Sequence, residues 1–232
     1  MRFLRLALPL LLSLSLGGCR AEFYLLQLFG PDHHYLGAAQ AVALLPPPPA
    51  PGSPGDQADI AVLRDWQAKR TPDECAAAKA QSGADYDAFF GGVSPFPDPL
   101  PDEASSVLFW VYYDGSRAAS AAKKKFARPR PFLRYHDLKP CLGTVSGLAY
   151  PSGHATVSRL LARVLSDVYP PGRAEIMARA DQAALNRVIG GVHHPSDIEA
   201  GKRLGDELYS ELLRQAAFRA DLEKLKKLAV KK

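Results

Sequence analysis

Residues 151–169, with the sequence PSGHATVSRLLARVLSDVY, carry the clearest helical pattern of the 232-residue chain. From Thr156 to Tyr169 the apolar side chains recur at intervals of three and four residues, the period of one buried helix face. They are Val157, Leu160, Leu161, Val164, Leu165 and Val168. Pro170-Pro171-Gly172 stops the pattern, because proline cannot continue a helix. We therefore predict a buried helix with the polar tetrapeptide Pro151-Ser152-Gly153-His154 at its N-terminal end.

Further helices are predicted on both sides of this segment, over residues 59–69, 73–81, 102–126, 174–189 and 195–214. The second of these opens with the capping box Thr71-Pro72-Asp73-Glu74. In the third, Asp114-Gly115 interrupts the pattern, so that one broken helix or two are expected.

No run of alternating apolar residues predicts strands, and no internal repeat is present. The sequence therefore predicts an all-α helical bundle. Residues 46–55 hold too much proline for a helix or a central strand, and we expect them to run extended over the surface. The basic tail, residues 222–232, is expected to be a solvated end of the chain.

The N-terminus has the features of a secretory signal peptide. Two arginines precede an apolar run from Leu6 to Leu16, which is too short to span a membrane. Small residues then lead to Cys19, as at a lipoprotein processing site; the alternative is a plain cleavage site nearby, with Cys19 incidental. We expect removal of residues 1–18, one domain over residues 19–232, and a periplasmic protein anchored to the outer membrane by a lipid on Cys19.

Two further cysteines, Cys75 and Cys141, would remain as an even pair in an oxidising compartment. A disulfide between them and two separate buried thiols both stay open at this point.

The formal charge of +5 does not indicate a nucleic-acid partner. Removal of the signal peptide takes away two arginines, and the basic tail holds five lysines against one glutamate. The remaining body therefore carries about one negative charge. We expect no nucleic-acid partner, and contact with a membrane only through a lipid anchor at Cys19.

Three clusters of polar residues lie in a fixed order along the chain: Lys123-x6-Arg130-Pro131, Pro151-Ser152-Gly153-His154 and Arg187-x5-His193-x3-Asp197. A phosphate dianion needs its oxygens neutralised, and arginine does this with a planar fork while lysine acts as a point charge. Ser152 and Gly153 come directly before the predicted helix, where backbone N–H groups can point at an anion. None of the clusters is persuasive alone, but together they indicate a phosphate site.

The two imidazoles of these clusters point to catalysis. Phosphoryl transfer through a covalent histidine requires one neutral nucleophile and one protonated acid, with a rate optimum on the acid side of neutrality. Metal ligation is a competing use of His154, His193 and Asp197. The neighbouring cations argue against it, since they would repel a divalent metal ion and favour an anion. We therefore expect no metal and no other cofactor.

This arrangement resembles the three-part signature of the phosphatidic acid phosphatase type 2 and vanadium haloperoxidase superfamily. Within it, the chain is most similar to the class A bacterial nonspecific acid phosphatases, from about Leu44 to Leu213. The likeness extends to Leu44-Leu45 with the prolines after it, to Asp65-Trp66-Gln67, to Arg70-Thr71-Pro72 and to Tyr150. One departure is Asn186, which stands where the family pattern has serine and which bears on a supporting hydrogen bond and on substrate preference.

The resemblance implies a helical core with the three clusters at the ends of neighbouring helices. It implies that His193 becomes phosphorylated, that His154 protonates the leaving alcohol, and that Asp197 fixes the tautomer of His193. His194 adjoins His193, but the spacing to Arg187 and Asp197 selects His193. The phosphate would be held by Lys123, Arg130, Ser152, Gly153 and Arg187.

The expected function is that of a metal-independent acid phosphatase, which hydrolyses small phosphate monoesters with broad specificity through a phosphohistidine. Phosphate transfer to other alcohols and assembly into a homo-oligomer are left open. A vanadium-dependent haloperoxidase is one alternative, although such enzymes are typically much larger. A lipid phosphatase of the membrane branch would need several apolar spans of about twenty residues. A lipoprotein that only binds phosphate would need the cations but not two histidines.

Overall fold

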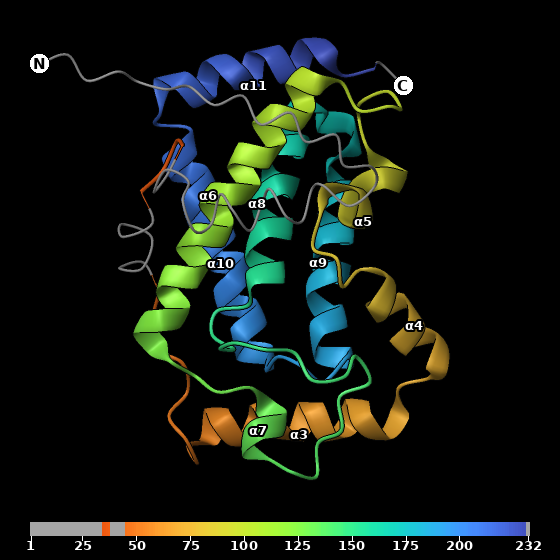
Figure 1. Ribbon diagram of the computed structural model, residues 1–232, viewed down its shortest axis with the longest axis vertical. Coiled ribbons are helices and arrows are strands. Elements are labelled where there is room, and N and C mark those ends of the chain that lie inside the picture. Colours follow the sequence, from red (N-terminus) through yellow and green to blue (C-terminus); the bar gives the residue numbers. More distant parts are fainter. Residues whose placement is uncertain (1–33, 38–44, 231–232) are drawn as a thin grey trace, which may run out of the picture. The chain divides into compact units, whose positions relative to one another are not determined.

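Helix α8 (Gly153–Val168) is the central element of the fold, as Figure 1 shows. Its side chains are buried around most of its circumference, including Leu160, Leu161 and Leu165, which is the pattern of a helix packed on several sides. It packs against α6 (Asp102–Phe126), α9 (Arg173–Ile189), α10 (Pro195–Leu212) and α11 (Ala216–Leu228). The helix predicted from Thr156 onward is confirmed, and Ser152 caps its earlier start at Gly153.

The computed structural model describes residues 34–37 and 45–230, all of them within one unit, Asp32–Lys232. None of these described residues lies in a β-strand, so the all-α prediction is confirmed. The predicted signal peptide, residues 1–18, and the predicted lipidation site at Cys19 lie outside the described residues. In the part that the structure describes, no helix combines the length and the apolar character needed to cross a membrane.

Two glycines allow α10 to cross α8 at close range. A β-carbon at Gly201 would lie 2.6 Å from the backbone oxygen of Ser152, and one at Gly205 would lie 2.8 Å from that of Thr156. Only a residue without a side chain leaves room for such a contact. The crossing places the first turn of α10 beside that of α8, where the N–H of Ser152 donates to the backbone oxygen of Asp197 (2.9 Å). Two of the three sequence clusters are thereby joined.

Helix α6 is continuous, which corrects the prediction that Asp114-Gly115 breaks it. Gly115 packs so closely on α8 that a β-carbon there would lie 2.8 Å from Cδ2 of Leu160. The buried carboxylate of Asp114 accepts hydrogen bonds from three consecutive backbone N–H groups, those of His34, Tyr35 and Leu36. Packing and hydrogen bonding therefore offset the low helix propensity of both residues.

The proline-rich segment is free of helix and turn only as far as Ala50. Pro51 and Gly52 form a turn in which the N–H of Ser53 donates to the backbone oxygen of Ala50 (3.0 Å), and α3 (Pro54–Lys69) begins directly after it. The hydroxyl of Ser53 accepts a hydrogen bond from the N–H of Asp56, and Pro54 occupies a helical position that needs no N–H. The prediction of extended chain over residues 46–55 is therefore wrong from Pro51 onward. Helix α3 packs against α9 and α10, and Figure 1 shows it across their ends, far from α11.

Helix α4 (Pro72–Ala80) follows the predicted capping box, in which Thr71 and Glu74 bond each other's backbone N–H groups. Of the two alternatives for the cysteines, the structure contains the disulfide. It joins Cys75 of α4 to Cys141, with Cα atoms 6.0 Å apart. Within the residues that the structure describes, four short helices were not predicted from the sequence: α5 (Tyr86–Phe90), η1 (Gly91–Val93), α7 (Pro131–Arg134) and η2 (Pro170–Gly172).

The C-terminal segment forms α11 where a solvated tail was predicted. Phe218, Leu222 and Leu225 are buried at helical spacing, and the helix packs on α6 and α8. Two of its lysines pair with carboxylates one turn earlier, Lys224 with Asp221 and Lys226 with Glu223. The density of lysine hid this amphipathic pattern, and the prediction for the basic tail is wrong as far as Leu228.

Candidate active site

The three sequence clusters meet where several helices end. Lys123 lies in the last turn of α6, Arg130 precedes α7, His154 lies in the first turn of α8, and Arg187 lies in the last turn of α9. Arg130 contacts His193 directly, and the charges of Arg130 and Arg187 lower the pKa of both Lys123 and His154, so we treat these groups as one candidate site.

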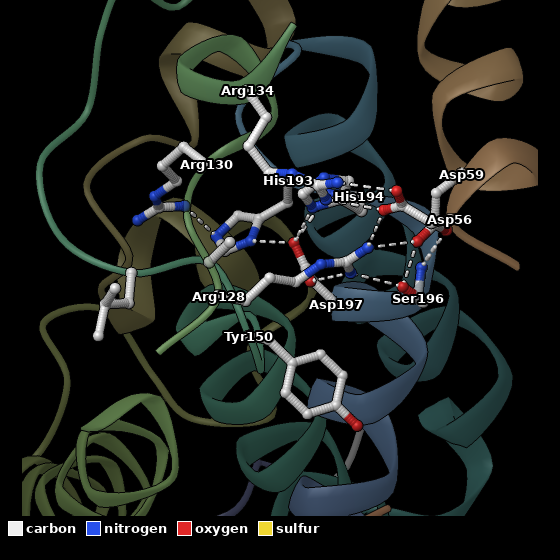
Figure 2. A network of polar contacts seen from close by, with 12 residues as sticks. Asp56, Asp59, Arg128, Arg130, Arg134, Tyr150, His193, His194, Ser196 and Asp197 are labelled. Atoms are coloured by element: carbon white, nitrogen blue, oxygen red, sulfur yellow. Dashed lines mark hydrogen bonds and ion pairs between the residues drawn. The ribbon is translucent and has the colours of Figure 1, made fainter. Parts of the chain in front are cut away.

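His193 is buried, and both of its ring nitrogens have partners. Its Nδ1 lies 3.3 Å from Oδ2 of Asp197, and its Nε2 lies 2.6 Å from Nη1 of Arg130 (Figure 2). A guanidinium group only donates, so Nε2 accepts and the ring proton sits on Nδ1. The lone pair of Nε2 is therefore directed at a cation. Burial, opposed by the hydrogen bond to Asp197, lowers the pKa of His193 well below its ordinary value.

His194 contacts the same carboxylate but has no contact with the arginine. Its backbone N–H donates to Oδ2 of Asp197 at 2.8 Å, and its Nδ1 lies 3.0 Å from that oxygen. Its Nε2 is buried and has no hydrogen-bond partner within residues 34–37 and 45–230. The contact with Arg130 therefore distinguishes His193 from its neighbour.

Burial would raise the pKa of Asp197, but the hydrogen bonds from His193 and His194 outweigh it and hold the pKa well below its usual range. Asp197 is fully enclosed, with none of its surface exposed. The structure therefore contains a buried carboxylate anion next to the ring N–H of His193.

Lys123 and Arg130 are held by neutral backbone oxygens. Nζ of Lys123 donates to the oxygens of Leu148 and Ala149, at 2.5 and 3.1 Å. The guanidinium of Arg130 donates to the backbone oxygens of Ser146, Gly147 and Val192. Burial, together with the charge of Arg130, lowers the pKa of Lys123 to about 7. These contacts fix the cations in place without neutralising their charge.

Arg187 gives the strongest indication that the site binds an anion. It is 5% exposed, and its Nε and Nη1 have no hydrogen-bond partner in the described part of the chain. A buried donor without an acceptor is costly, and the cost is larger for a charged group. Burial and the charge of Arg130 lower the pKa of Arg187 to about 10. A phosphate between these cations would satisfy the free donors of Arg187.

Ser152 differs from its predicted role. Its backbone N–H donates to Asp197, and its hydroxyl accepts a hydrogen bond from the N–H of Ala155 at 3.3 Å. The prediction that the Ser152 N–H points at an anion is therefore wrong, because that group closes the α8–α10 crossing. Its hydroxyl proton stays available. Gly153 opens α8, and N–H groups of a first helical turn have no partner within their helix.

His154 is half-buried and lies beside the segment that follows α4. Its Nε2 is 3.3 Å from the backbone oxygen of Ser82, and its ring packs edge-on against Phe89. A carbonyl oxygen only accepts, so Nε2 carries the ring proton in this contact. Burial and the charge of Arg187 lower the pKa of His154 to about 3. Burial and the charge of Arg187 therefore disfavour the charged form of this imidazole in the free protein.

A buried network of charges behind Asp197 was not predicted from the sequence (Figure 2). Nη1 of Arg128 donates to Oδ1 of Asp197 at 2.7 Å, and Nη2 reaches Asp59 at 2.9 Å and Asp56 at 3.3 Å. Arg134 donates one hydrogen bond to each carboxylate oxygen of Asp56, both at 2.8 Å. We call Asp56, Asp59, Arg128, Arg134 and Asp197 the carboxylate–arginine network. The spacing of Asp56 and Asp59 on one face of α3 was the available signal, but exposed helices show such pairs too.

Asn186 connects α9 to the segment beside His154. Its Nδ2 donates to Oε1 of Gln81 at 2.5 Å, and its Oδ1 accepts a hydrogen bond from Gln182 at 2.8 Å. Gln81 directly precedes Ser82, whose oxygen contacts His154. The asparagine side chain thus reaches Gln81, whereas the shorter side chain of the serine in the family pattern would not.

The described residues contain no group of three or more histidine, cysteine, aspartate or glutamate side chains suited to hold a metal ion. The donors of the site are mostly N–H groups and cations, which bind anions.

Comparison with known proteins agrees with this geometry. Residues 106–205 match the PAP2 superfamily. Over 213 residues the chain is 30% identical to a non-specific acid phosphatase of Providencia stuartii, and the match covers 84% of each protein.

Two solved structures share the fold. A bacterial vanadium-dependent iodoperoxidase superimposes with a TM-score of 0.62 at 20% identity, over 77% of this chain and 53% of the other. A transmembrane PAP2-type phosphatidylglycerolphosphate phosphatase from Bacillus subtilis gives a TM-score of 0.52 at 19% identity, over 81% of this chain and 92% of the other. At these identities the likeness concerns the fold alone.

Proposed function

The chain belongs to the PAP2 superfamily, and from this premise we propose that it hydrolyses phosphate monoesters of broad specificity through a phosphohistidine at His193. It is a phosphoric monoester hydrolase of the acid phosphatase kind. The proposed mechanism is carried by two contacts of the His193 ring, from which its tautomer follows: Nδ1 lies beside the carboxylate of Asp197, and Nε2 lies beside the guanidinium of Arg130.

Substrate binding begins with the phosphate among Lys123, Arg130 and Arg187. The free donors of Arg187 gain acceptors, and the phosphate takes over the hydrogen bond that Arg130 makes to His193. Gly153 and the hydroxyl of Ser152 add donors at the N-terminus of α8. Because most of these contacts reach only the phosphoryl group, the alcohol part of the ester is left unselected, which supports broad specificity.

In the first chemical step, Nε2 of His193 attacks phosphorus while the bond from phosphorus to the ester oxygen breaks. The leaving oxygen keeps that electron pair and takes a proton from His154. Asp197 stabilises the positive charge that develops on the ring of His193. In the second step, His154 accepts a proton from water, the water oxygen bonds to phosphorus, and the phosphorus–nitrogen bond breaks to release inorganic phosphate.

The proton on His154 arrives with the substrate. In the free protein burial and Arg187 keep this imidazole neutral above a pKa of about 3. A bound phosphate offsets the charge of Arg187 and of Arg130, so the pKa of His154 rises on binding. A monoester monoanion carries the needed proton, which makes acidic pH favourable for turnover.

For the cell, we propose export to the periplasm as a lipoprotein. The arginines, the apolar run and the small residues before Cys19 support it. The disulfide between Cys75 and Cys141 is compatible with an oxidising compartment.

Hydrolysis of p-nitrophenyl phosphate between about pH 4 and 9, with and without EDTA, tests the proposed function. We expect release of phosphate with an acidic optimum and no effect of EDTA. Binding of inorganic phosphate without turnover would instead identify a phosphate-binding protein. Halide oxidation that depends on added vanadate and peroxide, without hydrolysis in their absence, would identify a haloperoxidase.

A further inference from the structure

The carboxylate–arginine network joins α3 to the residue that orients the nucleophile. Arg128 links α3 to Asp197 (Figure 2). Its Nη1 contacts Asp197, and its Nη2 contacts Asp59 and Asp56. We propose that Arg128, clamped by these two carboxylates of α3, is a positioning residue that fixes Asp197 against His193. This inference rests on the proposed function. It makes α3, which precedes the residues that match the superfamily, a working part of the active site.

The two oxygens of Asp197 have different partners. Oδ2 is near three donors, the ring N–H groups of His193 and His194 and the backbone N–H of His194. Oδ1 faces Arg128. The contact with His193 is the longest of these, at 3.3 Å, so a small rotation of the carboxylate would break it first. Arg128 prevents that rotation by holding the opposite oxygen.

The charge of the network suits a cationic intermediate. Its three carboxylates face two guanidinium groups, which leaves one negative charge at neutral pH. Asp197 paired with Arg128 alone would form a neutral pair and would do little to stabilise a positive ring on His193. Because Asp59 and Asp56 also compensate Arg128, Asp197 keeps its negative charge for His193.

Arginine is needed at this place for its shape. Nη1 bonds Asp197 and the hydroxyl of Ser196, both at 2.7 Å, while Nη2 reaches α3. Ser196 in turn donates its N–H to Asp59 at 2.9 Å. Lysine has the charge but only one nitrogen, so it cannot span Asp197 and both carboxylates of α3. The conservative change therefore separates geometry from charge.

Arg128→Lys is the first test, measured as the single-turnover rate of phosphohistidine formation from a ³²P-labelled aryl ester. We expect that rate to fall by about 100-fold, the usual effect of a small misplacement of a reacting group. The inhibition constant of inorganic phosphate should change by less than about threefold, because Lys123, Arg130 and Arg187 hold the phosphate. Asp59→Asn keeps the side-chain shape and should slow the same step by about tenfold; it serves if Arg128→Lys does not fold.

The double variant of Arg128→Lys with Asp197→Asn tests whether Arg128 acts through Asp197. If Arg128 acts through Asp197, Arg128→Lys should slow phosphorylation little further once Asp197→Asn is present. Leu63→Ala is the matched control, because Leu63 is buried in α3 but belongs to the apolar cluster and not to the network. It should lower the midpoint of thermal unfolding and leave the phosphorylation rate of the folded protein near that of the wild type.

Four results would overturn the proposal: a wild-type phosphorylation rate in both Arg128→Lys and Asp59→Asn, a parallel loss of phosphate affinity, full additivity with Asp197→Asn, or an equal loss in Leu63→Ala. His193→Ala separates this failure from failure of the proposed function. A labelled intermediate that persists in His193→Ala contradicts the function itself, whatever the Arg128 variants do.

Discussion

Nη1 of Arg130 donates to Nε2 of His193 across 2.6 Å in the free protein. The arginine therefore occupies the lone pair that the proposed mechanism needs for attack. A phosphate oxygen is a better acceptor for a guanidinium than an imidazole nitrogen, since the bond is assisted by opposite charges. In the proposed mechanism, entry of the phosphate would therefore free Nε2 of His193 and couple substrate binding to its activation.

The lowered pKa of Lys123 leads to a prediction of how anion affinity depends on pH. Sulfate is a suitable probe, because it keeps two negative charges across the whole range. With its pKa lowered to about 7, Lys123 is charged in the free protein below that pH and must gain a proton on binding above it. We expect sulfate affinity to fall as pH rises from 7 to 9, by up to about tenfold per pH unit. Isothermal titration calorimetry measures this.

Lys123→Arg is the control for this pH dependence, because arginine stays charged throughout the range. The fall in affinity above pH 7 should disappear in the variant. An equal fall in both proteins would assign the titration to another group and contradict the lowered pKa of Lys123.

Substitution of the proposed acid should discriminate between leaving groups. An alkoxide needs a proton to leave, whereas p-nitrophenolate leaves unaided, so His154→Ala should slow alkyl esters about 100-fold or more relative to aryl esters. Comparison of kcat/KM for both ester types checks this. Equal losses would reduce His154 to a group that only binds phosphate.

Substitution of Asn186 should also slow alkyl esters more than aryl esters, but less strongly than substitution of His154. Asn186→Ser removes the hydrogen bond to Gln81, so the segment carrying the oxygen of Ser82 is held less firmly beside His154. We expect alkyl esters to slow by a few-fold more than aryl esters, together with a loss of about 1 kcal/mol in the free energy of unfolding. A stability change without any shift in leaving-group preference would limit Asn186 to a structural role.

The disulfide leads to two predictions, one for the alkylation of the two cysteines and one for the free energy of unfolding. Never-reduced protein, alkylated under denaturing conditions, should retain Cys75 and Cys141 unmodified. The bond closes a long loop, with a sequence separation of 66, so its removal in the double variant Cys75→Ser, Cys141→Ser should cost roughly 2 to 4 kcal/mol in urea unfolding. Alkylation of both cysteines in the native sample would show that the bond does not form.

The central helix and the three clusters of the candidate site were predictable because their information is local. The three-and-four spacing after His154 defines α8, and the fixed spacing from Arg187 to Asp197 spans a single turn between two helices. The continuity of α6 was not predictable, because Gly115 is compensated by contact with Leu160 of another helix. Its neighbour Asp114 is compensated by N–H groups about eighty residues away in sequence.

The carboxylate–arginine network escaped prediction for a related reason. Asp59 and Arg128 are 69 residues apart, and each by itself is an ordinary charged residue that is usually exposed. They meet because α3 packs against α10 and Arg128 contacts Ser196 and Asp197 of α10 as well, and both charged side chains are buried there. Long-range pairing of charges leaves no periodic signal in one sequence.

Trapping of the covalent intermediate tests the central claim most directly. The enzyme is mixed with a ³²P-labelled monoester, quenched in alkali within milliseconds, digested, and the labelled peptide is sequenced by mass spectrometry. The account predicts one phosphoryl group on His193, stable in alkali and lost in acid, and no label in His193→Ala, with turnover abolished. Label on another residue, or near-normal turnover of His193→Ala, would contradict it.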